Sequence, residues 1–221
     1  MDPASGLDAI RTIGISGGTI RTVSRHSLRG RDTLDARGLV VAPGFIDLHQ
    51  HAQDPAGYRV QVLDGTTTAF ELEEGTDDVD RWYADRAGTT LTNYGVSVGQ
   101  TLARMRVMGD TGREVPVGPA ASRAATATEI KAIIQRMDDG LRQGAVAAGV
   151  LIEETPAVRQ WEIFEMFRTA ARYRASVHVH VRSLAEPFYF LETEEVLGAV
   201  AASGAGSGTT SAEESANMPP S

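Results

Sequence analysis

The chain has 221 residues, 42% of them hydrophobic and 23% charged, which is an ordinary composition for a soluble globular protein. A formal net charge of -8, with no basic patch that carries aromatic residues, argues against nucleic acid as the main partner. The sequence contains no cysteine, which excludes disulfides and thiolate metal ligands, and no apolar run near the roughly 20 residues that span a membrane.

The first 44 residues alternate between short apolar runs and turns that contain glycine. The runs IRTIGI and TIRTVS flank the pair Gly17-Gly18, and the run GLVVAPGFIDL follows. Short runs of this kind, separated by glycine, are typical of antiparallel β structure. Residues 1–44 are therefore predicted to form part of a small β domain.

Five strand-like runs follow from residue 45 onward, and helical patterns separate the later ones. Strands that alternate with helices predict βαβ units with parallel pairing. A (β/α)8 barrel needs eight strands and typically about 250 residues. Residues 45–203 are thus predicted to form an α/β domain, a partial (β/α)8 (TIM-type) barrel with about five of eight strands. The five runs are FIDLHQH (45–51), TTTAFELE (66–73), TLTNYGVSV (90–98), AVAAGVLIE (145–153) and SVHVHV (176–181).

Two of the intervening helices have clear signals in the sequence. Thr126 and Glu129 form a capping box in front of a segment whose apolar residues recur at helical spacing. The next helix is expected to have Pro156 in its first turn, where the missing N–H of proline is harmless. The buried stripe of that helix is predicted to contain Trp161, Phe164, Phe167 and Ala171.

The two ends of the chain carry simpler predictions. Residues 204–221 are small and polar without periodicity. Such a segment cannot bury enough apolar surface to offset the entropy of ordering, so a disordered tail is predicted. The beginning of the chain lacks a basic segment followed by an apolar run, so no secretory signal is expected. Together with the absence of cysteine, this predicts a cytoplasmic protein.

The strongest chemical signal lies in PGFIDLHQH, residues 43–51, where one residue separates His49 from His51. In a strand, side chains two residues apart point to the same face. At the C-terminal end of a barrel strand, that face opens on the active site. Two neutral imidazoles there suit a divalent cation; the alternative is a pair of surface or core histidines. Without thiolates, the remaining ligands must be imidazole or carboxylate, which suits zinc, iron or manganese.

These residues resemble a known family. GLVVAPGFIDLHQH is similar to the first barrel strand of the amidohydrolase superfamily, entered from a small β-sandwich domain. GTTTAFELEEG, WYADRAG, NYGVSVG and RQWEIFEMFRTAARYRASVHVHVRS resemble, more particularly, N-acyl-D-amino-acid deacylases (D-aminoacylases, including the N-acyl-D-glutamate type). The resemblance covers residues 2 to about 204. It implies a metal-dependent hydrolase, with zinc the expected metal, that acts on the non-peptide carbon–nitrogen bond of a small N-acyl amino acid.

The resemblance also implies a metal ligand on the fifth strand. The family places a histidine at the end of that strand, and its closest match in HVHVR is His180. His178 shares the strand face by period two, so the two histidines remain alternatives. A packed histidine, or one that supports the ligands from behind, is the favoured interpretation of His178. Arg182 is a further candidate for a supporting or substrate-facing role.

A two-metal site needs a bridging anion as well. Many amidohydrolases use a carboxylated lysine on strand four, but the only lysine here, Lys131, lies in a helical pattern. Related deacylases carry a cysteine near the end of strand two, and this chain has none. Glu71 and Glu73 share one strand face, and Glu73 lies nearer the strand end, so Glu73 is the predicted bridge and Glu71 a supporting residue. The alternative is that these glutamates form a solvated acidic turn.

The reaction implied by the resemblance is metal-assisted amide hydrolysis. The metal lowers the pKa of bound water toward about 7 and polarises the scissile carbonyl, while a carboxylate transfers the proton to the leaving amine. In the superfamily that carboxylate is an Asp at the end of strand eight, to which no residue here corresponds. The predicted site therefore consists of the metal ligands His49, His51, Glu73 and His180, without an assigned proton donor.

The sequence departs from the family in three places. A strand that precedes the segment DPASGLDA in the family is absent, and Glu154 stands before Thr155-Pro156 where relatives often have tyrosine. From about Ala205 the sequence is rich in Gly, Ser and Thr, where the family continues into a sixth strand with another histidine. A frameshift, a premature stop, a gene-model boundary and a genuine short paralogue each account for this end. We expect exposed sheet edges and no catalysis by this chain alone.

Two other functional interpretations stay open. One is a non-catalytic metal-binding or interaction module derived from the half-barrel and completed by a partner chain. The other is a different amidohydrolase, such as a dihydroorotase or hydantoinase. The glutamate-rich second strand and the missing strand-four lysine argue against the latter. Whether the downstream reading frame encodes strands six to eight separates a fragment from a module.

Overall fold

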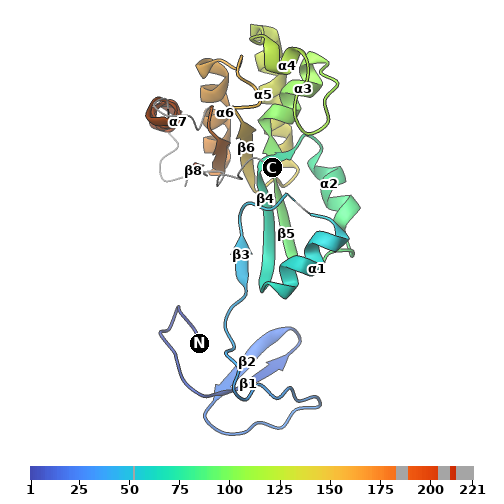
Figure 1. Cartoon of the computed structure of the whole chain (residues 1–221), viewed down its shortest axis with the longest axis vertical. Coiled ribbons are helices and arrows are strands. Elements are labelled where there is room, and N and C mark those ends of the chain that lie inside the picture. The colour runs from blue at the N-terminus through green and yellow to red at the C-terminus, as the bar shows by residue number, and fades with distance from the viewer. Residues whose placement is uncertain (52, 183–188, 204–209, 213–221) are drawn as a thin grey trace, which may run out of the picture. The chain divides into compact units, whose positions relative to one another are not determined.

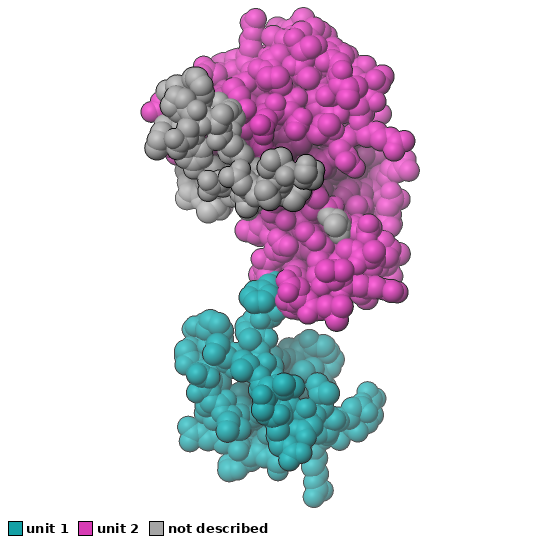
Figure 2. All heavy atoms as spheres, in the orientation of Figure 1, with its two compact units in different colours: residues 1–45 teal, residues 46–221 magenta. Residues whose placement is uncertain are grey.

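The computed structural model describes residues 1–51, 53–182, 189–203 and 210–212 (Figure 1). The chain divides into two compact units, Met1–Phe45 and Ile46–Ser221, which Figure 2 shows in different colours. The first unit contains a small sheet, and all of the described helices belong to the second. None of the described helices is long and apolar enough to cross a membrane.

The first unit is built around a two-stranded antiparallel sheet. β1 (Thr12–Ser16) pairs with β2 (Thr19–Ser24), and Gly17 and Gly18 form the turn between them. Both glycines have positive φ, 59° and 73°, a conformation that residues with a Cβ rarely adopt. The antiparallel β structure predicted for this region is confirmed, although residues 38–44 form no strand.

A six-stranded sheet forms the centre of the second unit, in the order β3-β4-β5-β6-β7-β8. From β4 to β8, neighbouring strands pair in parallel. Helices connect most of them, and Figure 1 shows these helices beside the sheet. The predicted partial α/β barrel is therefore confirmed. The strands are β3 (Phe45–Asp47), β4 (Thr66–Thr76), β5 (Asn93–Gly99), β6 (Ala147–Leu151), β7 (Ser176–His180) and β8 (Thr210–Ala212).

The core lies between one face of this sheet and the helices. Alternate residues of the strands, such as Val96 and Val98 in β5, pack against buried residues of the helices, such as Ile133 and Phe167. Because successive side chains alternate between faces, every second strand residue is left for the opposite face. The helices are α1 (Pro55–Leu63), α2 (Val79–Arg86), α3 (Gln100–Met108), α4 (Pro119–Ser122), α5 (Ala127–Arg142), α6 (Gln160–Tyr173) and α7 (Tyr189–Ser203).

The structure confirms the predicted start of one of the two helices with clear sequence signals and not that of the other. At the start of α5 the capping box is present, because the Thr126 side chain accepts from the Glu129 N–H and the Glu129 side chain accepts from the Thr126 N–H. The predicted start of α6 is wrong, since this helix begins at Gln160. Pro156 lies in the preceding turn, where the Thr155 hydroxyl donates to the Leu151 carbonyl at 2.9 Å and so competes with helix formation.

The buried stripe of α6 is also rotated relative to the prediction. Trp161 is 60% exposed, and Phe164 and Ala171 are only partly buried. Phe167 is buried as predicted. The later helix start places a different set of side chains toward the sheet, namely Ile163, Met166, Phe167 and Ala170.

The predicted disordered tail, residues 204–221, lies outside the described residues except for β8. Thr210–Ala212 pairs in parallel with β7, so the prediction of no regular structure is wrong for these three residues. The free edge of β7 offers backbone N–H and C=O groups, which even a small, polar segment is able to pair with.

Candidate metal centre

His49 and His51 come together just after the short strand β3 ends. The strand stops at Asp47, whose side chain accepts a hydrogen bond from the His49 N–H at 3.1 Å. The Gln50 N–H then donates to the Phe70 carbonyl of β4 at 3.0 Å, which holds this segment beside β4. The histidines thus lie beyond the strand that was expected to carry them.

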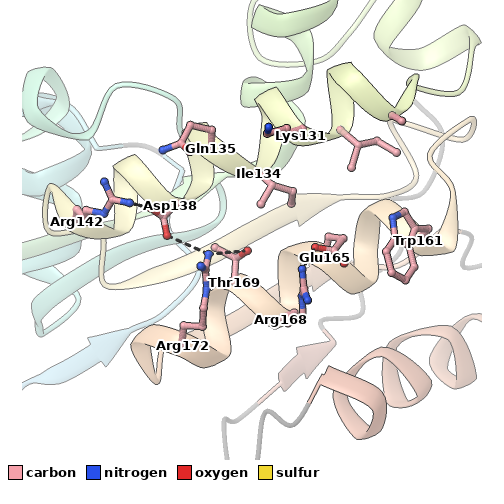
Figure 3. Close-up of a pocket in the computed structure, with 12 residues that line it drawn as sticks. Lys131, Ile134, Gln135, Asp138, Arg142, Trp161, Glu165, Arg168, Thr169 and Arg172 are labelled. Carbon is pink, nitrogen blue, oxygen red and sulfur yellow. Dashed lines mark hydrogen bonds and ion pairs between the residues drawn. The ribbon is translucent and has the colours of Figure 1, made fainter.

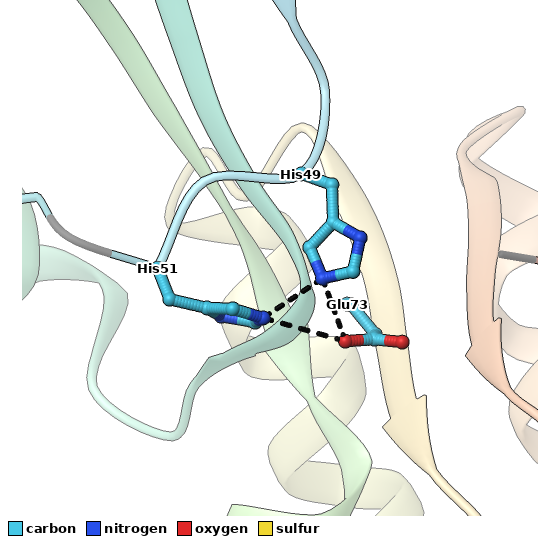
Figure 4. Close-up of side chains that lie close together, drawn as sticks. All are labelled: His49, His51 and Glu73. Carbon is cyan, nitrogen blue, oxygen red and sulfur yellow. Dashed lines mark hydrogen bonds and ion pairs between the residues drawn. The ribbon is translucent and has the colours of Figure 1, made fainter. Parts of the chain in front are cut away.

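The two imidazoles nevertheless converge, as Figure 4 shows. Their Nε2 atoms are 2.8 Å apart, and the rings meet edge to face with centroids 4.6 Å apart. Two nitrogens at this separation lie within hydrogen-bonding distance of each other. Their convergence agrees with the geometry expected from the one-residue spacing, even though backbone bonds to β4, rather than a continuous strand, produce it.

Glu73, near the end of β4, is the central group of the cluster. Its Oε2 lies 3.0 Å from His49 Nε2 and 3.5 Å from His51 Nε2. Its other oxygen, Oε1, lies 3.0 Å from Nδ1 of His180, the last residue of β7. One buried carboxylate therefore lies between the pair His49 and His51 and a third imidazole, His180, that is far from them in the sequence.

The charges in this cluster stabilise one another. Burial by itself raises the pKa of Glu73, but the hydrogen bonds with His180, His49 and His51 outweigh burial and lower that pKa well below its usual range. The hydrogen bond to Glu71, followed by that to Glu73, raises the pKa of His51 to about 10. The hydrogen bond to Glu73 raises the pKa of His180 to about 9. Without a metal, protons on His51 and His180 balance the carboxylates.

The donor set suits a divalent cation. One ligand atom each from His49, His51 and Glu73 lies within 4.8 Å of the others. Imidazole nitrogen and carboxylate oxygen are ligands that zinc binds, and three protein ligands with an open position are typical of catalytic zinc sites. Glu71 and Glu74 form a second such group with His51.

The three residues predicted to support the metal ligands or face the substrate have different surroundings in the structure. Glu71 is buried, and its Oε2 lies 2.7 Å from His51 Nδ1. His178 is buried with its Nε2 3.0 Å from the Ser176 hydroxyl, and burial lowers its pKa. Arg182 forms an ion pair with Glu195 at 2.9 Å and donates to the Pro156 and Val158 carbonyls. His180, the other histidine of β7, is bonded to Glu73.

Glu153 is a neighbour of the cluster that the sequence analysis did not identify. Its Oε2 lies 2.8 Å from Nε2 of His180. This residue follows β6 by two positions, in the acidic pair Glu153-Glu154. An acidic residue just beyond a barrel strand was the available signal, but nothing local indicated which of the two glutamates faces the site.

A separate groove of about 620 Å³ lies between α5 and α6 (Figure 3). None of the residues that line it belongs to the histidine cluster. Its acidic side chains pair with its own arginines: Asp138 with Arg172 at 3.0 Å, and Glu165 with Arg168 at 2.5 Å. The Asp138 pair joins α5 to α6, so these charges contribute to helix packing.

Part of this sequence is similar to sequences of known proteins. Residues 32–95 match the family model described as "Amidohydrolase family". A dihydroorotase from Geobacter metallireducens is 35% identical over 72 residues, and one from Anaeromyxobacter sp. (strain K) is 42% identical over 72 residues. Each of these matches covers 31% of this chain and 17% of the relative.

Solved structures match over much more of the chain. An N-acyl-D-glutamate deacylase from Bordetella bronchiseptica, complexed with zinc and a phosphonate inhibitor, matches with a TM-score of 0.74 and 23% identity. A D-aminoacylase matches with a TM-score of 0.73 and 22% identity. These matches cover 88% and 89% of this chain, but 45% and 46% of the solved chains. The chain thus shares their fold and spans less than half of their length.

Proposed function

We propose that this chain carries the metal centre of an amidohydrolase of the N-acyl-D-amino-acid deacylase type. The observation that carries the proposal is the position of Glu73, whose two oxygens face His49 and His51 on one side and His180 on the other. From this position Glu73 would serve the ligands on both sides of the cluster at once. Zinc is the expected metal, since the donor set suits it and a protein of similar fold is complexed with zinc.

The residues of the chain have distinct roles in this proposal. When bound, a divalent cation supplies an acidic water and polarises the scissile carbonyl. His49 and His51 would hold a cation through Nε2, and His180 through Nδ1. Glu73 would neutralise positive charge from its buried position between them. The expected substrate is a small N-acyl amino acid.

Dihydroorotase is the competing assignment within the same superfamily, because the curated relatives carry that name. One observation favours the deacylase type. The only lysine, Lys131, lies in α5 rather than at the end of a strand, so a carboxylated lysine on the fourth strand is not available.

Metal content tests the proposal directly. Protein loaded with zinc and then dialysed should retain at least one equivalent, and His49→Ala and Glu73→Gln should each lose most of it. His26→Ala is the matched control, since His26 is an exposed histidine of the first unit, and it should retain zinc like the wild type. Equal, negligible zinc in the wild type and in His49→Ala would refute the metal site.

We further propose that the 221 residues by themselves do not complete the reaction. No residue of this sequence corresponds to the acid/base Asp that the family places on strand eight, and general acid–base catalysis contributes about 10²–10⁴-fold to such rates. Assays with N-acetyl-D-amino acids and with dihydroorotate should give no turnover above background. Turnover of either substrate at rates typical of enzymes would overturn this part and identify the substrate class.

A further inference from the structure

His51 and His180 both contact Glu73, and they come from distant parts of the chain. Each of the two rings has a second carboxylate near the ring nitrogen that does not face Glu73. His51 has Glu73 near Nε2 and Glu71 at 2.7 Å from Nδ1. His180 has Glu73 at 3.0 Å from Nδ1 and Glu153 at 2.8 Å from Nε2. The pattern is the same in both cases, but the two rings present opposite nitrogens to the centre.

The geometry points to Glu153 and Glu71 as positioning residues that determine which ring nitrogen of His180 and His51 faces the metal. This inference rests on the proposed metal site. A carboxylate that accepts the N–H of one ring nitrogen leaves the other nitrogen as the metal-facing acceptor. Glu153 thus directs Nδ1 of His180 toward Glu73, and Glu71 directs Nε2 of His51 toward Glu73.

The backbone around Glu153 is held in place. Leu151, the last residue of β6, pairs in register with His180 of β7, and the Ile152 N–H donates to the His180 carbonyl at 2.9 Å. The Thr155 hydroxyl donates to the Leu151 carbonyl at 2.9 Å, which closes the turn that follows. Glu153 lies between these two fixed points, so its carboxylate reaches His180 from a rigid segment.

Burial separates the expected strengths of the two positioning residues. The Glu71 side chain is 7% exposed and also accepts from the Glu74 N–H at 3.2 Å, whereas the Glu153 side chain is 47% exposed. Water screens an exposed charge, so Glu71 should have the larger effect. Glu153 is the better subject for mutation, because a half-exposed residue tolerates substitution without unfolding the protein.

The test compares Glu153→Ala, Glu153→Gln and the control Glu154→Gln in the complete chain. Removing a carboxylate that supports a ligand weakens metal binding by about 10- to 100-fold. We expect Glu153→Ala to raise the dissociation constant for zinc about 10-fold, measured by competition with a chelator. Glu153→Gln should have a smaller effect, because its amide oxygen still accepts a hydrogen bond. Glu154→Gln should bind like the wild type.

The other outcomes are informative. Loss of a metal equivalent in Glu153→Ala, or an altered visible spectrum of the Co²⁺-loaded protein, would make Glu153 a direct ligand and overturn the positioning role. An unchanged affinity would overturn it as well. If the wild type binds no metal, the proposed function fails, and ¹⁵N spectra of the His180 ring, recorded on metal-free protein at a pH at which the ring is neutral, decide whether Glu153 fixes the position of its N–H. These resonances should shift in Glu153→Ala but not in Glu154→Gln, and equal spectra would refute the inference.

Discussion

The two units of the molecule use apolar residues in opposite ways. No residue of the first unit, 1–45, is fully buried, and Ile10 and Leu34 are 97% and 92% exposed. In the second unit, Ile163 and Phe167 are completely buried between the sheet and its helices. Both units contain strands rich in Ile and Val, so composition does not explain the difference.

The number of packed layers of secondary structure explains this difference in burial. A two-stranded sheet has no second layer to cover its apolar face, and an isolated hairpin is marginally stable at best. In the second unit, each helix covers the strands that it connects, so both elements lose apolar surface to one another. We therefore expect matched substitutions to have large effects in the second unit and small effects in the first.

The largest contrast should come from two arginine–carboxylate pairs of nearly equal length. Arg104–Glu162, at 2.5 Å, is completely buried in the second unit, whereas Arg37–Asp35, at 2.6 Å, is exposed in the first. Arg104→Met leaves the buried Glu162 carboxylate without its counter-charge and with only the hydrogen bond from the Gln100 amide, and we expect it to reduce the free energy of unfolding by about 3–5 kcal/mol. Arg37→Met should cause no measurable change. Urea unfolding followed by circular dichroism measures both, and equal effects would contradict the comparison.

A pair of isoleucines provides the apolar version of the same test. Ile163 on α6 is completely buried, and Ile20 on β2 is 61% exposed. Ile163→Ala should reduce the stability of the second unit by about 2–5 kcal/mol, because it removes buried apolar surface and leaves a cavity. Ile20→Ala should stay within about 0.5 kcal/mol of the wild type. Hydrogen exchange by mass spectrometry reads each unit separately, and slow exchange throughout residues 1–45 would show that the first unit has a core after all.

The smallest effect is expected where polar bonds, rather than burial, organise a segment. The Asp110 side chain accepts from four backbone N–H groups, those of Gly112, Val117, Gly118 and Ala120, at 2.9–3.0 Å. Partial burial raises its pKa, but these four donors together lower it below the usual 3.8. Asp110→Asn keeps one acceptor oxygen, so we expect a loss on the order of 1 kcal/mol at neutral pH.

The pH dependence of this effect has a definite sign. Because the folded pKa of Asp110 is lowered, its contribution is present above about pH 3.8 and is lost as the pH falls through the folded pKa. The stability difference between wild type and Asp110→Asn should therefore shrink from pH 6 to pH 3. Asp8→Asn, at an exposed position of the first unit, is the control and should show no such change with pH. A stability difference between wild type and Asp110→Asn that grows as the pH falls would refute this role of Asp110.

The strands and helices were predictable because they depend on local patterns, whereas the convergence of His49 and His51 also depends on a backbone bond to β4. Alternating strands and helices from residue 45 onward indicated the half-barrel, and the spacing of His49 and His51 indicated convergent imidazoles. A position nearer the strand end predicts Glu73 rather than Glu71 as the central carboxylate, and in the structure the two oxygens of Glu73 contact His49 and His180. The start of α6 was not predictable from Pro156, because the competing bond of Thr155 depends on where β6 ends.

Sequence alone thus determined the residue types of the candidate site, the order of the strands that carry them and the face on which paired residues lie. Only the tertiary structure brought His180 to Glu73, placed Glu153 beside His180, and set which ring nitrogen of His180 lies nearest each of these carboxylates. The physical reason is that the two-residue alternation along a strand specifies the face on which a side chain lies. It does not specify the depth of that side chain, that is, how far along the strand it lies relative to the neighbouring strands. Depth and ring orientation depend on the register between β6 and β7 and on carboxylates that long stretches of chain bring to the same edge of the sheet.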